Sequence, residues 1–339
     1  MAGIRVEKEL EYKVIEHITD NACSTLRIVI NKECTLNCEW CYKEGIDHNC
    51  SKPRLTIKTL IRCIKLAKKS GFTKINFTGG EPLLYPNLFK IVKAADIIGL
   101  NTYVTTNATL FAGINLKDWT SLKNHEFHIT LNTIDNKEFI RISKEDMLEN
   151  VLRGIKALLA HDIPLKFNTV VTSEKDWPRI KKVLDFARRF KITVKLLGVH
   201  DSTFFKSMPQ RNVAKMLLDK GARYVGTSTG KAANYGYEQY ILNGTRVHVL
   251  NMVYGGGCCE RYRLGLCGEG IRYPRLVYTG EIKPCLHKSI GIIKNDSTDK
   301  EIIDLLRASQ NHIQRISSEP YLLDSNQWGN NSGDNHYDF

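Results

Sequence analysis

The chain has 339 residues, 25% of them charged, and a net charge of +13 at neutral pH. This length suits one α/β barrel with an added module. No run of about 18 apolar residues occurs, and charges interrupt the N-terminus where a signal peptide needs an apolar core. These features argue against membrane-spanning and secreted proteins, so we expect a cytoplasmic protein without a membrane partner.

The basic net charge favours anionic partners such as nucleotides, phosphates or acidic peptides. Solvated, lysine-rich helix faces explain most of this charge in our interpretation. The stretches at 65–70 and 179–183 are typical of such faces. We therefore expect an anionic ligand but no nucleic-acid partner.

Short strand-like runs alternate with amphipathic helical patterns in the first 200 residues. In chain order, the sequence predicts a strand at 26–30, a helix at 55–70, a strand at 74–77, a helix at 87–98, strands at 102–106 and 127–131, a helix at 147–160, a strand at 165–171, a helix at 175–190 and a strand at 192–197. Strands that alternate with helices form parallel sheets with right-handed crossovers. We therefore predict an α/β fold, a partial (β/α)6 barrel, whose functional residues follow the carboxyl ends of the strands.

The alternation is expected to stop after residue 200. Strands are predicted at 247–254 and 275–285, the second broken by a turn at 279–281, and a short helix at 301–310. The predicted domains are an N-terminal extension (1–23), the barrel (24–200), a C-terminal module (201–315) and a polar, flexible tail (316–339).

Seven of the ten cysteines fall into two groups, and clustered cysteines in a reducing compartment are typically metal ligands. The first group is Cys34, Cys38 and Cys41, with the spacing C-x3-C-x2-C after the first strand. Structural zinc sites use four ligands, whereas three thiolates suit an iron–sulfur cube with one open iron. His48 or Cys50 as a fourth ligand is the alternative. The remaining cysteines, Cys23 and Cys63 among them, are interpreted as free thiols.

A second motif, T-G-G-E-P at 78–82, follows the second strand. Gly79 and Gly80 allow backbone to approach a ligand closely, and Glu81 can accept a hydrogen bond from an amine. Together, C-T-L-N-C-E-W-C and T-G-G-E-P resemble, in order and spacing, the two best-known motifs of the radical S-adenosylmethionine (radical SAM) superfamily.

The resemblance implies a 4Fe-4S cluster on Cys34, Cys38 and Cys41, whose fourth iron binds SAM. One electron would cleave SAM to methionine and a 5′-deoxyadenosyl radical, which abstracts a substrate hydrogen. The resemblance also implies a set of SAM-binding residues: Trp40, Gly79, Gly80, Glu81, Thr105, Thr106, Asn107, Thr130 and Asn132. Capping at strand ends is the alternative role of the threonines and asparagines, and ordinary packing is the alternative for Trp40.

The second group is Cys258, Cys259, Cys267 and Cys285, for which we predict a second 4Fe-4S cluster, with a structural zinc site as the alternative. From about 24 to 310 the chain is similar to the GTP 3′,8-cyclases of molybdenum-cofactor synthesis, and to the wider group with a SPASM or twitch auxiliary-cluster domain. The similarity is carried by L-R-I-V-I-N-K-E-C-T-L-N-C-E-W-C, T-L-N-T-I-D-N-K-E-F-I-R-I-S, L-K-F-N-T-V-V and G-E-I-K-P-C-L.

The chain also departs from those cyclases. Gly270 stands where a cluster cysteine belongs, so Cys258 or Cys259 would replace it, and Asn76 stands where an arginine is expected. The chain ends in D-N-H-Y-D-F instead of a Gly-Gly tail. The resemblance implies that basic residues bind an anionic substrate: Arg27, Lys74, Lys195, and Arg272 or Arg275.

The leading hypothesis is a radical SAM enzyme with an auxiliary cluster, served by an external one-electron donor of the flavodoxin or ferredoxin type. Its substrate would be an anionic, nucleotide- or nucleoside-like small molecule, or a peptide. One alternative is a GTP 3′,8-cyclase. Another is a zinc-stabilised, basic nucleotide- or RNA-binding protein. His200 and His287 are interpreted as structural.

Overall fold

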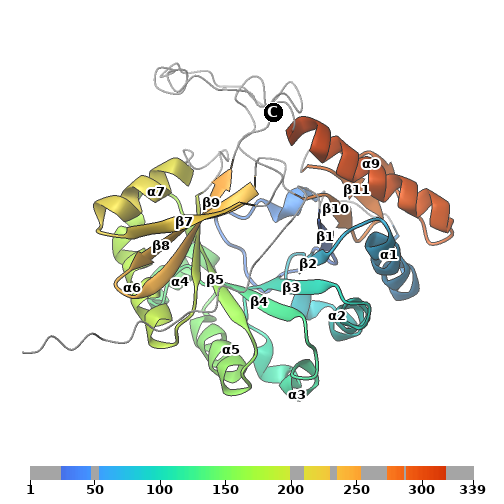
Figure 1. Ribbon diagram of the computed structural model, residues 1–339. Helices are drawn as coiled ribbons and strands as arrows, with labels where there is room; N and C mark the ends of the chain where they lie inside the picture. Colours follow the sequence, from blue (N-terminus) through green and yellow to red (C-terminus); the bar gives the residue numbers. More distant parts are fainter. Residues whose placement is uncertain are drawn as a thin grey trace, which may run out of the picture.

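The computed structural model describes residues 24–46, 53–198, 210–229, 235–252, 273–285 and 288–317. They form one curved 12-stranded sheet with helices along its outer side (Figure 1). The strands are β1 (Thr25–Val29), β2 (Lys74–Thr78), β3 (Asn101–Thr106), β4 (His125–Thr130), β5 (Leu165–Val171), β6 (Val194–Gly198), β7 (Arg223–Thr229), β8 (Tyr235–Leu242), β9 (Thr245–Met252), β10 (Arg275–Val277), β11 (Glu281–Lys283) and β12 (Gly291–Ile292).

The helices alternate with the parallel strands. They are α1 (Ile57–Lys69), α2 (Leu88–Ile97), α3 (Leu116–Trp119), α4 (Asn136–Ser143), α5 (Leu148–Ala160), α6 (Trp177–Arg189), α7 (Gln210–Asp219) and α9 (Asp299–Ser317). Four short turns of 3-10 helix are η1 (Lys43–Gly45), η2 (Pro82–Leu84), η3 (Phe111–Gly113) and η4 (Glu174–Asp176). No helix in these described ranges is both long and apolar enough to cross a bilayer.

Neighbouring strands run parallel through the whole middle of the sheet, in the order β10-β1-β2-β3-β4-β5-β6-β9. Antiparallel strands continue it at both edges, with β11 and β12 beyond β10 and with β8 and β7 beyond β9. Parallel strands place their carboxyl ends on one rim, where the connecting loops meet. The predicted parallel sheet of a partial barrel is therefore confirmed.

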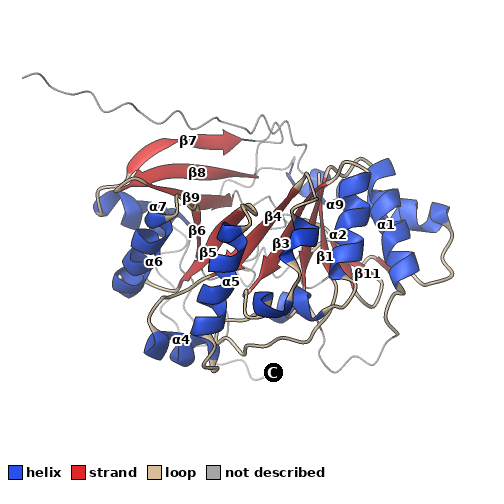
Figure 2. Ribbon diagram, turned by 90° about the horizontal axis from the view of Figure 1, so that it is seen from below, coloured by secondary structure: helices blue, strands red, loops and turns tan. Residues whose placement is uncertain are grey.

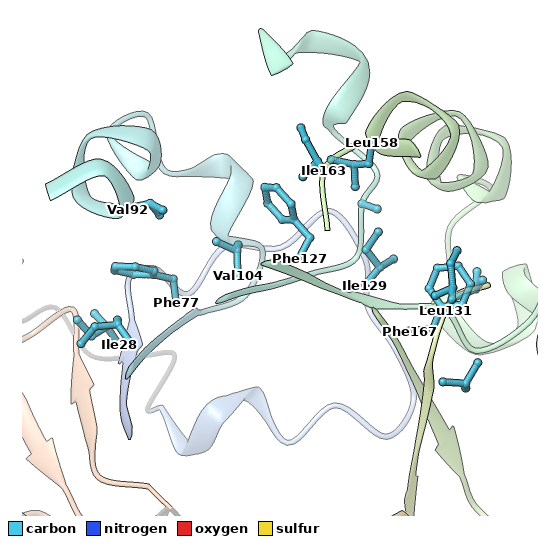
Figure 3. Close-up of a cluster of buried hydrophobic side chains, with 14 of the residues drawn as sticks. Ile28, Phe77, Val92, Val104, Phe127, Ile129, Leu131, Leu158, Ile163 and Phe167 are labelled. Carbon is cyan, nitrogen blue, oxygen red and sulfur yellow. The ribbon is translucent and has the colours of Figure 1, made fainter. Parts of the chain in front are cut away.

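Apolar side chains face the helices. Ile28, Phe77, Val104, Phe127 and Ile129 are at most 1% exposed and point to the helix side of the sheet, as Figure 3 shows. Because successive side chains of a strand alternate between faces, the residues between them point to the inner face. The core therefore lies between sheet and helices, and the inner face is left for polar side chains.

Local sequence sets the helix ends. Thr56 caps α1, since its hydroxyl accepts a hydrogen bond from the Thr59 N–H at 3.2 Å. Gly71 and Gly99 follow α1 and α2 with φ angles of +95° and +71°, which few other residues adopt without strain. The sequence predicts that these helices end at residues 70 and 98, directly before the two glycines, and the observed ends at Lys69 and Ile97 are one residue earlier.

The expectation that the alternation of strands and helices stops after residue 200 is wrong, because one more helix and parallel strand follow. After β6 come α7, the antiparallel pair β7 and β8, and then β9, which pairs parallel with β6. The antiparallel pair β7 and β8 lies between α7 and β9 in the chain, so the sequence does not show a helix followed directly by a strand. Beyond β9, β10 pairs parallel with β1, so the predicted domain division at residue 200 does not coincide with an edge of the sheet (Figure 2). Residues 1–23 and 318–339 lie outside the described residues.

Candidate active site

The first three cysteines lie in the loop that leaves the carboxyl end of β1. Cys34 and Cys41 are exposed, and Cys38 is partly buried. Burial, followed by the nearby thiols of Cys41 and Cys34, raises the pKa of Cys38 to about 12. All three cysteines lie within the same short loop. As thiols they must lose their protons to bind a metal.

The thiols are the donor set that an iron–sulfur cube uses. Among the residues that the structure describes, no group of three or more His, Cys, Asp or Glu side chains is arranged around a single metal-ion position. The three thiolates of a cube bind three different irons, so they need not converge on one point. The all-sulfur donor set fits a cluster of this kind. His48 and Cys50, the alternative fourth ligands, lie outside the described residues.

Backbone hydrogen bonds fix this loop against α4. The Asn37 N–H donates to the Ser143 carbonyl oxygen at 2.9 Å, and the Glu39 N–H donates to the Ile142 carbonyl oxygen at 3.1 Å. The Arg141 guanidinium reinforces the contact with a 3.0 Å bond to the Glu39 carboxylate. The cysteine loop is therefore attached to a packed helix rather than held by its own residues alone.

Asn107 ties the same loop to the end of β3. Its side-chain amide donates to Thr35 Oγ1 at 3.0 Å and points to Cys34 Sγ at 3.6 Å. The Leu36 N–H is a second donor to Cys34 Sγ, at 3.4 Å. Donors of this type orient a thiolate ligand and tune the potential of a cluster.

The glycines of T-G-G-E-P are needed for packing. A Cβ on Gly79 would lie 2.1 Å from Asn31 Oδ1, and one on Gly80 would lie 2.2 Å from the Glu33 carbonyl oxygen. Gly80 and Glu81 donate backbone hydrogen bonds to Asn31 and Glu33, at 3.1 and 2.7 Å. The turn after β2 thus lies directly on the start of the cysteine loop.

Glu81 organises the ends of two strands from a fully buried position. Its carboxylate accepts hydrogen bonds from the Thr106 hydroxyl at 2.6 Å, the Asn107 N–H at 2.8 Å and the Leu83 N–H at 3.0 Å. Burial raises the pKa of Glu81 to about 7, against these three donors. The carboxylate serves the protein itself, and its predicted contact with the amine of SAM stays a prediction.

The other predicted SAM contacts lie along the same rim. Thr105 Oγ1 donates to Asn76 Oδ1 at 3.1 Å on the inner face, and Thr130 is partly buried at the end of β4. Asn132 Oδ1 accepts from the Val170 N–H at 2.9 Å, which supports the alternative of a strand-end cap.

Trp40 packs against Arg179, a residue expected to be solvated. The Arg179 guanidinium lies 5.8 Å from the Trp40 ring centre, and Arg179 is 8% exposed. It donates to the carbonyl oxygens of Asn132 at 2.5 Å and Val170 at 2.9 Å. The prediction of a solvated face is wrong at this residue, which joins β4 and β5 to the cysteine loop.

Two of the predicted anion-binding arginines share a carboxylate on the inner face. Arg27 and Arg275 are in register on β1 and β10. Glu44 Oε2 lies 3.1 Å from Arg27 Nη1 and 3.5 Å from Arg275 Nε. Nothing in the sequence singles out Glu44, since its partners come from strands far apart in the chain.

The opposite side of the inner face carries lysines and histidines. Lys195 on β6 donates to the Tyr237 hydroxyl at 3.1 Å, and Lys166 on β5 pairs with Glu126 at 3.2 Å. Burial, followed by the charge of Lys195, lowers the pKa of His128 to about 4, although Glu126 Oε2 lies 2.8 Å from its ring. His128 was not identified from the sequence, because a lone histidine on a strand carries no positional signal.

Buried polar atoms on this face without a hydrogen-bond partner within the described ranges include Arg27 Nε, Asn168 Oδ1 and His248 Nε2. Such groups are normally satisfied by protein, water or ligand. Register places Asn168 beside Lys195 and Lys195 beside His248. The inner face is therefore suited to a polar ligand.

The structure describes only some of the remaining predicted residues. Lys74 begins β2 and is partly buried. Cys285, also partly buried, follows the hairpin of β10 and β11. The other predicted residues of the C-terminal region lie outside the described residues: Cys258, Cys259, Cys267, Gly270, Arg272 and His287, together with His200.

Comparison with known proteins gives concordant results. The chain is 24% identical over 315 residues to a GTP 3′,8-cyclase of Helicobacter pylori, covering 91% of this chain and 92% of the relative. It is 26% identical over 325 residues to a GTP 3′,8-cyclase of Sulfurimonas denitrificans, covering 93% and 95%.

The fold matches solved structures as well. Streptococcus suis SuiB, bound to its precursor peptide SuiA, superposes with a TM-score of 0.59 at 18% identity, over 84% of this chain. This chain spans 64% of the length of SuiB. Residues 28–187 match the family model of the Radical SAM superfamily. The matched residues include the cysteine loop and the Glu81 network, which meet at the rim of the sheet.

Proposed function

We propose that this protein is a radical SAM enzyme that abstracts hydrogen from a polar small molecule or a peptide. When bound, the 4Fe-4S cluster and SAM supply a 5′-deoxyadenosyl radical through one-electron cleavage of SAM. The residues of the chain hold these groups, exclude water and orient the substrate. An external one-electron donor of the flavodoxin or ferredoxin type would supply the electron, and the need for reduced thiols favours the cytoplasm.

One observation carries this proposal. The loop with Cys34, Cys38 and Cys41 is bonded to the ends of β2 and β3 through Glu81 and Asn107. In this arrangement the three thiolates would ligate three irons. The SAM contacts proposed around them are Trp40, Gly79, Gly80, Glu81, Thr105, Thr106, Asn107, Thr130 and Asn132.

A second 4Fe-4S cluster in a SPASM- or twitch-like module is part of the proposal. Cys258, Cys259, Cys267 and Cys285 would hold it. The position of Cys285 supports it, because this cysteine follows a hairpin that extends the sheet directly beside β1. Iron and sulfide analysis of protein purified without oxygen tests it. About eight irons per chain are expected for two cubes, and about four would leave only the first.

A GTP 3′,8-cyclase is the second candidate function. It is favoured by the two relatives of that name, which match the chain over nearly its full length. Asn76 argues against it, because a neutral side chain stands where those cyclases are expected to carry an arginine. Incubation with GTP, SAM and dithionite distinguishes the two candidates. Conversion of GTP to a cyclised product would establish the cyclase.

The zinc-stabilised binding protein makes a contrasting prediction. It requires zinc without sulfide and no cleavage of SAM. The same metal analysis would then show zinc in place of iron, and the enzyme proposal would be lost.

A further inference from the structure

Glu44 occupies the space between the two arginines that were predicted to bind an anionic substrate. It comes from η1, directly after the cysteine loop, whereas Arg27 and Arg275 come from β1 and β10. Lys43 and Glu44 have φ angles of 50° and 53°, in the left-handed region that few non-glycine residues adopt. The chain thus takes an unfavourable backbone conformation where it brings this carboxylate to the inner face.

The Glu44 carboxylate is built to stay ionised. It is 7% exposed, and it accepts hydrogen bonds from Thr78 Oγ1 at 3.0 Å and from the Tyr42 hydroxyl at 3.2 Å. Burial favours its neutral form, but Arg27, Arg275 and these donors lower its pKa overall. Two guanidinium groups and one carboxylate leave a net charge of +1.

Two adjoining positions, on β2 and β3, carry no charge. Asn76 is in register with Arg27, and Tyr103 is in register with Asn76. Burial raises the pKa of the Tyr103 hydroxyl well above its usual value, so it is neutral. The cluster of Arg27, Glu44 and Arg275, which we call the arginine wall, therefore contributes one net positive charge. Lys74 lies on the same face of β2, and Lys283 on β11 is in register with Arg275.

We infer that Glu44 is a specificity-determining residue, which cancels one arginine charge of the arginine wall, so that the wall favours a ligand group of low negative charge, such as a carboxylate, over polyphosphates. Electrostatic attraction scales with the product of the charges, so a polyphosphate loses the most when one arginine charge is neutralised. This inference rests on the proposed function, because it describes the surface on which that enzyme would hold its substrate.

The test measures the binding of inorganic tripolyphosphate to the full-length, cluster-loaded protein by calorimetry without oxygen. Glu44→Gln keeps the shape of the side chain and raises the net charge of the wall to +2. We expect at least tenfold tighter binding than in the wild type. Glu126→Gln is the matched control, since it removes another inner-face carboxylate that pairs with Lys166 instead of the arginines. Its effect should stay below threefold.

The double variant Glu44→Gln/Arg27→Gln restores the net charge of +1 and should return the affinity to within threefold of the wild type. If Glu44→Gln does not fold, Arg275→Gln takes its place. It reduces the net charge to zero and should weaken tripolyphosphate binding at least tenfold. An unchanged affinity for tripolyphosphate in Glu44→Gln, or in Arg275→Gln where that variant takes its place, would overturn the inference. Equal gains in affinity for Glu44→Gln and Glu126→Gln would also overturn it.

The same preparations are assayed for 5′-deoxyadenosine after addition of SAM and dithionite. If the wild type forms none, the proposed function fails while the affinities still decide the role of Glu44. If it forms 5′-deoxyadenosine and the affinities do not change, only the inference about Glu44 fails.

Discussion

The Thr106 hydroxyl donates a 2.6 Å hydrogen bond to the Glu81 carboxylate and so joins the end of β3 to the turn after β2. Both residues are at most 2% exposed. The same turn packs on the start of the cysteine loop through Gly80. The geometry of the cysteine loop therefore depends on the buried Glu81 carboxylate.

Thr106→Val removes the hydroxyl without changing the shape of the side chain. It leaves the buried Glu81 carboxylate with one donor fewer, and hydrogen bonds to charged groups contribute about 1.5–3 kcal/mol. We expect the free energy of unfolding to fall by about 2 kcal/mol, measured by urea denaturation. Thr102→Val is the control, because the Thr102 hydroxyl is equally buried but bonds a neutral carbonyl oxygen, that of Asn124. It should cost about 1 kcal/mol; equal losses would contradict the role given to Glu81.

Gly80→Ala should disturb the cysteine loop. Its Cβ would lie 2.2 Å from the Glu33 carbonyl oxygen, so the backbone of the loop must move. Overpacking of this kind typically costs about 1–3 kcal/mol. We expect that loss in stability together with a clear decrease in bound iron and sulfide.

Gly113→Ala provides the control for that substitution. A Cβ there meets no atom within 4 Å, and Gly113 does not have a positive φ. Iron content and melting temperature should stay at the wild-type values. A fully iron-loaded Gly80→Ala protein would show that the close contact with Glu33 is not required.

Acid should destabilise the protein below about pH 6.5. Burial and nearby cations lower the pKa of His128 to about 4 and that of His248 to about 3. A base with a lowered pKa in the folded state stabilises that state above its unfolded pKa, and this contribution is lost as pH falls toward the folded value. For His128 alone the loss is about 3 kcal/mol by pH 4.

Glu81 has the opposite effect on stability, because its pKa is raised to about 7. Between pH 7 and 4.5 it is protonated more readily in the folded than in the unfolded state, so acid stabilises the fold through this residue. The informative quantity is therefore the difference between the wild type and the double variant His128→Gln/His248→Gln, in which the contribution of Glu81 cancels. The unfolding free energy of the variant should fall less steeply between pH 6.5 and 4.5 in urea denaturation. Parallel curves would show that the two histidines are not held neutral.

Much of the barrel could be predicted from local sequence because its strands and helices have clear periods. The strand at 165–171 was placed to the residue, and the helices before Gly71 and Gly99 end where glycine requires them to end. Helix α4 was missed, although Asp135 caps it and Phe139 and Ile142 bury one face. The Asn243-Gly244 turn between β8 and β9, with positive φ at both residues, is a hairpin signal that was overlooked.

The candidate site was also predictable only in part. Cysteine spacing and T-G-G-E-P identify the loops, since both are continuous in sequence. Glu44 and Arg179 could not be assigned, because their roles depend on partners that only the folded sheet brings together. A buried arginine such as Arg179 has the same sequence context as the solvated lysines beside it.

The formation of 5′-deoxyadenosine is the most direct measure of the proposed enzyme. Protein purified without oxygen is mixed with SAM and dithionite, in the wild type and in two variants. The wild type and Cys63→Ala should form 5′-deoxyadenosine, because Cys63 is buried in α1 and lies apart from the cysteine loop. Cys38→Ala should form none, since it removes a proposed ligand of the cluster. Absence of the product in the wild type, or equal amounts in Cys38→Ala, would contradict radical SAM chemistry at this loop.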